Sequence, residues 1–176
     1  MMKRIITVLI AVLMIGVVLC SCGKKDEKAK NVTTTVPAKY DDGYAEKYAD
    51  SFSTDDDGNV VYKFSGDKYD EYLKSHKNTL GKEVQGELKM SHTGTDDEAA
   101  KYGEYAYIKD DANAVIIGVH KKEYDKKVAE KESAIAAEYG FKYFQNLEKP
   151  VDTITVIYCD ANNQDTVFGE FEYTAD

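Results

Sequence analysis

Val115-Ile116-Ile117-Gly118-Val119 is apolar on both faces, and this stretch predicts a central β-strand. Residues 104–109 have a strand pattern as well, and Asp110-Asp111-Ala112-Asn113 between the two stretches predicts a hairpin loop. The second half of the chain is therefore expected to contain a sheet that begins with this hairpin.

Apolar residues at spacings of three and four predict a helix before the hairpin, over residues 67–90. Gly81 and Gly86 weaken this prediction, because each costs roughly 1 kcal/mol relative to alanine inside a helix. The alternative is a helix that ends near Thr79, with a strand at residues 84–90.

The same spacing predicts a second helix after the hairpin, over residues 122–147. Gly140 lies on the apolar stripe of this helix. A glycine there indicates a close approach to another backbone, or else a helix that ends at Tyr139.

Alternating apolar residues predict further strands at residues 60–64, 153–159 and 167–173, while residues 41–57 fit either a short helix or a strand at 51–54. The predicted order is β-α-β-β-α-β followed by a terminal strand. This is the ferredoxin-like order, and it predicts an α+β fold in which two helices cover one face of an antiparallel sheet.

The amino terminus has the three parts of a secretory signal. Lys3 and Arg4 provide the positive charge, residues 5–19 form an apolar run in which Thr7 is the one polar side chain, and a small residue, Ser21, precedes Cys22. The run is short for a membrane span, which needs about 20 residues. The alternative interpretation is an uncleaved signal anchor.

Leu19-Cys20-Ser21-Cys22 resembles the lipobox of bacterial lipoproteins, although a cysteine at the second position is unusual. The resemblance covers only residues 1–22. It implies that residues 1–21 are removed after Ser21, that the Cys22 sulfur carries a diacylglycerol, and that the protein is attached to a bacterial cell membrane and faces outside the cytoplasm. No other cofactor is expected.

Residues 22–40 are rich in lysine and threonine, and they predict a flexible tether that follows the lipidated cysteine. Residues 41–176 are expected to form a single α+β domain, because a chain of this length can bury its own core.

The charge of the chain excludes one class of partner. The whole chain has a formal net charge of −9, and residues 22–176 have −11, because Lys3 and Arg4 are the only charged residues before Cys22. Nucleic-acid binding needs a basic patch, so this composition argues against it. A cation or a basic partner fits better.

Residues 53–64 partly fit a calcium-binding EF-hand loop, with Asp55, Asp57 and Asn59 among the candidate ligands. The first position holds Ser53 and the last holds Phe64, where a bidentate glutamate belongs. An acidic turn that precedes a strand is the alternative interpretation.

The remaining motifs give no catalytic assignment. His76, His92 and His120 lack the spacing of a helix-borne zinc site, and the chain has no Gly-x-Ser-x-Gly sequence and no phosphate-binding glycine loop. Once Cys22 is lipidated, Cys159 is the remaining thiol, and its strand pattern favours a buried apolar side chain over a nucleophile.

All 14 tyrosines lie after the signal, and most occupy positions that suit a core. Tyrosines also serve as anchors in interfaces, and Tyr102, Tyr105 and Tyr107 are the best candidates for an exposed patch. The sequence therefore favours a lipid-anchored domain that binds an envelope protein or a solute. The alternatives are a small envelope hydrolase with a scattered site and an inhibitor or immunity-type lipoprotein.

Overall fold

The computed structural model describes residues 30–91 and 103–175, and within it β5 (Ala114–Val119) is buried along its whole length. β5 lies inside a four-stranded sheet of order β4-β5-β6-β7. The pairing of β4 and β5 is antiparallel, which confirms the predicted hairpin. The other strands of this sheet are β4 (Tyr105–Lys109), β6 (Thr153–Asp160) and β7 (Asn163–Thr174).

β5 and β6 are parallel, whereas the two outer pairs of the sheet are antiparallel. The parallel pair needs a crossover, which α2 (Lys126–Phe144) provides. Asp125 caps this helix by accepting hydrogen bonds from the backbone N–H groups of Lys127 and Val128.

α2 continues through Gly140, so the alternative end at Tyr139 is wrong. A Cβ at Gly140 would lie 2.7 Å from Ile154 Cδ1 and 2.8 Å from Val115 Cγ2. The close approach expected at this glycine is thus to side chains of β6 and β5 and not to another backbone.

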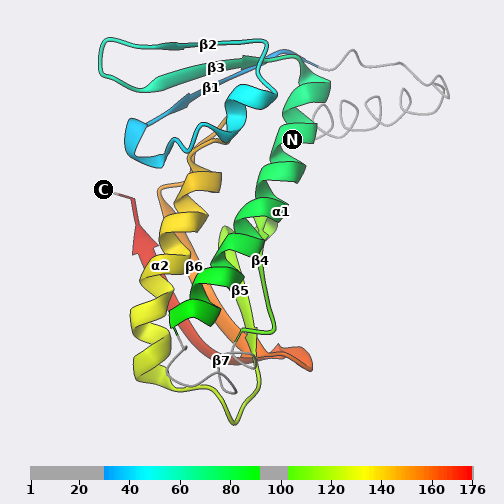
Figure 1. The fold of residues 1–176 in the computed structure, drawn as a ribbon, viewed down its shortest axis with the longest axis vertical. Helices are drawn as coiled ribbons and strands as arrows, with labels where there is room; N and C mark the ends of the chain where they lie inside the picture. The colour runs from blue at the N-terminus through cyan, green and yellow to red at the C-terminus, as the bar shows by residue number, and fades with distance from the viewer. Residues whose placement is uncertain (1–29, 92–102, 176) are drawn as a thin grey trace, which may run out of the picture.

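α1 (Gly66–Ser91) is one continuous helix, which confirms the long prediction and excludes an end near Thr79. Both helices lie on the same side of the four-stranded sheet, as Figure 1 shows, and the predicted two-helix layer is present. In the part of the chain that the structure describes, no helix is long and apolar enough to cross a membrane.

A second sheet of three strands corrects two predictions. Its order is β1-β3-β2, with β1 (Val32–Val36), β2 (Ser51–Thr54) and β3 (Val60–Phe64) all antiparallel. The single sheet of the ferredoxin-like order is therefore not confirmed, because β3 pairs with β1 and β2 and not with the sheet of β5.

β1 and the short 3₁₀ helix η1 (Ala38–Tyr40) lie within residues 22–40, for which a flexible tether was predicted. That prediction is wrong for residues 32–40. Val32, Thr34 and Val36 point inward and are buried, so this segment contributes to the core. The strand alternative at residues 51–54 is confirmed as β2, although the 3₁₀ helix η2 (Tyr44–Lys47) precedes it.

One hydrophobic cluster joins both sheets and both helices, and it includes Phe64, Tyr72, Val115 and Ile154. A smaller cluster of Ala114, Ile116 and Cys159 lies on the opposite face of the four-stranded sheet, which we call the open face. The signal, Cys22, His92 and Tyr102 lie outside the described residues.

Candidate functional site

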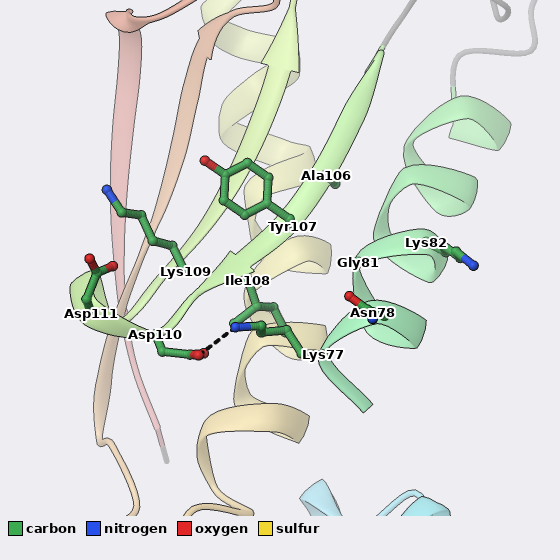
Figure 2. Close-up of a pocket in the computed structure, with 10 residues that line it drawn as sticks. All are labelled: Lys77, Asn78, Gly81, Lys82, Ala106, Tyr107, Ile108, Lys109, Asp110 and Asp111. Carbon is green, nitrogen blue, oxygen red and sulfur yellow. Dashed lines mark hydrogen bonds and ion pairs between the residues drawn. The ribbon is translucent and has the colours of Figure 1, made fainter. Parts of the chain in front are cut away.

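A hollow of about 740 Å³ lies between α1 and β4, and Figure 2 shows its lining. α1 contributes Lys77, Asn78, Gly81 and Lys82, which recur on one side of the helix because successive turns bring these positions together. β4 and the 3₁₀ helix η3 (Asp110–Ala112) supply the opposite wall.

Gly81 brings α1 close to β4. A Cβ at this position would lie 2.9 Å from the carbonyl oxygen of Ala106 and 3.3 Å from Cα of Tyr107. Both atoms belong to backbone, so neither can move aside cheaply. Gly81 weakened the helix prediction, but here it allows the close approach of α1 to β4 beside the hollow.

The charged side chains of the hollow are directed to different sides. Lys77 Nζ bonds Asp110 Oδ2 at 2.6 Å across one end, whereas Lys82 points away from β4. Lys109 and Tyr107 point together to the side of β4 that faces away from α1 (Figure 2). Both side chains therefore start from the strand that walls the hollow but lie outside it, and we call this position, defined by Lys109 and Tyr107, the rim.

Tyr107 also belongs to the open face, where it lies beside Tyr105 with a ring-centroid distance of 6.0 Å. Both rings are half-buried over the apolar cluster of that face. Burial raises the pKa of both phenols, and at Tyr105 the neighbouring Cys159 thiol raises the pKa further. Two of the three tyrosines of the predicted patch are thus close together on one surface.

Tyr105 covers β5 and Cys159 at the same time. A Cβ at Gly118 would collide with the Tyr105 ring, so this glycine lets the ring lie flat on β5. The Tyr105 hydroxyl is 3.5 Å from Cys159 Sγ, and the Tyr107 hydroxyl donates to Gln164 Oε1 at 3.1 Å. Cys159 is a free, buried thiol, as its strand pattern predicted.

The calcium candidate forms a turn between β2 and β3. Asp55 Oδ1 accepts hydrogen bonds from the backbone N–H groups of Asp57 (3.0 Å) and Asn59 (2.8 Å), and Asp55 Oδ2 accepts from the Asn59 side chain at 3.1 Å. These bonds, led by those from Asn59, lower the Asp55 pKa. The geometry is that of an Asx turn, which supports the alternative of an acidic turn.

The two described histidines have separate partners. His120 Nε2 lies 2.6 Å from Glu104 Oε1 on the surface, whereas His76 is fully buried in α1. Within residues 30–91 and 103–175, no group of three or more His, Cys, Asp or Glu side chains is arranged to hold a metal ion.

His76 connects α1 to the segment before η2. Its Nε2 lies 2.9 Å from Asp42 Oδ2, and its Nδ1 lies 2.9 Å from the Tyr72 hydroxyl. A carboxylate only accepts hydrogen bonds, so Nε2 carries a hydrogen and, in the neutral ring, Nδ1 accepts from Tyr72. Figure 1 shows this upper part of α1 beside η2 and the three-stranded sheet.

The pKa values in this chain follow from burial and from the paired charges. Burial alone raises the pKa of Asp42, but the bond and charge of His76 and the Tyr44 N–H outweigh it, so the net pKa is lowered. Burial, followed by the charge of Asp42, raises the pKa of Tyr72. Asp42, His76 and Tyr72 do not line the hollow, and His76 is hydrogen-bonded to both of the others.

Sequence reasoning missed both the hollow and the Asp42–His76–Tyr72 chain. The hollow joins residues 77–82 to residues 106–111, and Asp42 is 34 positions from His76, so no local pattern links them. The usable signals were Gly81 within an apolar stripe and a histidine on the same stripe.

Comparison with protein-family models, with curated proteins and with solved structures found no match.

Proposed function

We propose that this chain is a lipid-anchored protein of a bacterial cell envelope that binds a ligand outside the cytoplasm, at the hollow and the adjoining pair Tyr105 and Tyr107. The observation that carries the proposal is the rim where Lys109 and Tyr107 point the same way beside a hollow of about 740 Å³. The lipobox-like sequence at Leu19 to Cys22 supports the location.

The rim indicates the chemistry of the ligand. An aromatic ring offers a flat surface on which sugar or other rings stack, and a lysine offers three donors to an anionic or hydroxyl group. Lys77 is paired with Asp110 and Lys82 points away from β4, so Lys109 is the cation of this surface that lies on the same side of β4 as Tyr107. A small envelope solute or wall fragment that combines a ring with a negative group fits this surface.

The ligand is tested by thermal unfolding of the purified chain with sugars, sugar acids, wall fragments and short peptides. A ligand at 100 times its Kd should stabilise the fold by about 2.7 kcal/mol, which raises Tm by several degrees. Lys109→Glu should abolish the rise, whereas Lys131→Glu, the same change on the exposed side of α2, should leave it intact. Equal rises in both variants would contradict the site.

The anchor is tested separately by cell fractionation. Cys22→Ala should abolish lipidation, so the variant should either be released from membranes or remain unprocessed at a larger size. Wild type and variant that both stay in the membrane fraction at the same size would contradict the anchor and leave the ligand test unaffected.

A further inference from the structure

β7 forms the far edge of the four-stranded sheet. The opposite edge, β4, lies against α1, and Gly81 makes the close contact there. Among the described residues, the only strand that pairs with β7 is β6. An edge strand of 12 residues with a free side is a template for an additional strand.

The hydrogen bonds between β6 and β7 identify the free backbone groups. The Ala175 N–H donates to the Asp152 carbonyl at 2.7 Å, just beyond the register pair Thr153–Thr174. In an antiparallel ladder bonded and non-bonded pairs alternate, so the N–H and C=O groups of Glu170, Glu172 and Thr174 point away from β6. These are the groups that a fifth strand would use.

The side chains of the same edge carry negative charge. The register places Glu172 level with Thr155 and Glu170 level with Ile157, which puts both carboxylates on the open face. Both glutamates are exposed, and in the described part of the chain neither takes part in an ion pair. Two unpaired charges thus lie two residues apart beside the half-exposed Ile157.

The negative charge of β7 favours a basic segment of another protein over a second copy of this chain as the strand that pairs with the β7 edge. A second copy would add another β7, which contains three acidic residues and no lysine or arginine, so like charges would face each other across the new pair. An extended segment with lysine or arginine at alternate positions would instead place a cation opposite each glutamate. The formal charge of −9 would also steer such a segment toward the protein.

We propose that the β7 edge binds an extended basic segment of another protein as a fifth strand, with its cations on Glu170 and Glu172. Main-chain bonds supply affinity in this mode of recognition, and the alternating side chains supply specificity. The inference goes beyond the hollow and depends on neither its ligand nor its lysines.

The test uses the full chain in detergent micelles and a fluorescent peptide of eight residues in which lysine and valine alternate. Binding is followed by fluorescence polarisation and by amide hydrogen exchange. Binding should slow exchange at Glu170, Glu172 and Thr174, whereas the amides of Phe171 and Tyr173, which face β6, should already be slow. The same peptide with N-methylated amides on one edge keeps its charge but cannot pair, and it should bind about tenfold more weakly or worse.

The matched variants separate the edge from the general charge of the chain. Glu170→Lys with Glu172→Lys should weaken binding by about tenfold or more, because two attractive cross-strand pairs become repulsive. Glu71→Lys with Glu130→Lys makes the same charge change on exposed helix positions and should have a small effect. An unchanged Tm shows that the edge variant folds, and Glu172→Gln provides a milder variant if it does not.

Three results would overturn the proposal. Equal binding of the methylated peptide, or an equal loss in the helix variant, would show unspecific charge attraction. Absence of binding, together with self-association of a Glu170→Gln, Glu172→Gln chain, would show that the carboxylates only prevent self-pairing of β7. Binding that leaves exchange at the edge amides unchanged would place the peptide elsewhere.

Discussion

The first half of α1 packs through aromatic rings and directed hydrogen bonds, whereas its second half packs through aliphatic side chains and a backbone contact. In the first half, Tyr72 stacks on Phe64 at a centroid distance of 5.3 Å and bonds His76, which in turn bonds Asp42. In the second half, the leucine and valine side chains of α1 are buried, and Gly81 lies against the backbone of β4. The packing of α1 thus depends on hydrogen-bond geometry in its first half and on close packing in its second half.

Because of this difference, the first half of α1 should be sensitive to pH and the second half to added side-chain volume. The first half holds the three-stranded sheet and η2 through titratable groups, so proton uptake affects its contacts. Tyr62 extends this polar network by donating to Asp41 Oδ1 at 2.8 Å, and burial followed by this carboxylate raises the Tyr62 pKa. The second half sets the wall of the hollow through close packing, which is insensitive to pH but intolerant of added volume.

The largest effect is expected from His76→Phe in the first half of α1. Phenylalanine keeps a ring in the buried space but leaves the Tyr72 hydroxyl and the Asp42 carboxylate without their partner. Each orphaned polar group costs roughly 1–3 kcal/mol, so the free energy of unfolding should fall by about 3 kcal/mol. Urea denaturation measures this change.

The control is the same substitution at His120, which is partly exposed and whose partner Glu104 is half in solvent. Surface ion pairs contribute about 0–1 kcal/mol, so His120→Phe should change stability little. Comparable losses in the two variants would show that the buried chain does not hold this half of the helix.

The second prediction tests the other half with two identical substitutions in one helix. Gly81→Ala should destabilise the protein by about 1–3 kcal/mol, because its Cβ meets the backbone of β4. Gly86→Ala meets nothing within 4 Å and should stabilise it by roughly 0.5–1 kcal/mol through helix propensity. Opposite shifts in Tm are expected, and two shifts of the same sign would contradict the backbone contact.

The sequence predicted elements whose pattern is local and missed those that depend on distant pairing. The hairpin of β4 and β5, the helix α2 and the continuity of α1 follow from alternation and from spacings of three and four. β1 was missed because threonines 33–35 gave no clear alternation, although Thr34 is buried between Val32 and Val36. The methyl group of threonine suits a buried strand better than its polar class suggests.

The division into two sheets could not be read from strand patterns. Residues 60–64 show the same alternation whether they join β5 or β1, and only the pairing partners decide. The hollow lies between α1 and β4, and no local pattern indicates that these two elements come together. Of the predicted site residues, Tyr105 and Tyr107 lie close together. Lys77 and Lys109 were not predicted, because they carry no signal in the sequence.

The third prediction uses pH to separate the halves of α1. The folded-state pKa of Asp42 is lowered, so the unfolded chain, with an aspartate pKa of about 3.9, takes up this proton first as pH falls. The contribution of Asp42 is therefore present above about pH 4 and is lost as pH falls through the folded pKa. Wild type should exceed Asp42→Asn in stability at pH 7, and the gap should narrow as pH falls below about 4.

The comparison for this experiment is Gly81→Ala, whose deficit arises from packing and should not change between pH 7 and pH 3. Urea denaturation of the three proteins at several pH values measures both gaps. A gap for Asp42→Asn that stays constant as pH falls below about 4 would show that the asparagine is harmful for reasons other than charge.

The smallest effect is expected where the two halves of α1 meet, at Lys77. Its ion pair with Asp110 is partly exposed, with side-chain exposures of 32% and 48%, so it should contribute about 0.2–1 kcal/mol. A double-mutant cycle of Lys77→Met and Asp110→Asn isolates the pair from the effect of Asp110 on Tyr143, whose pKa is raised by burial and then by this aspartate. Because the pair is solvated, its coupling should vanish in 1 M salt, where the Debye length is about 3 Å. A coupling that persists in about 1 M salt would contradict a solvated Lys77–Asp110 pair. It would show that this pair, like the hydrogen bonds of the buried His76, is shielded from solvent.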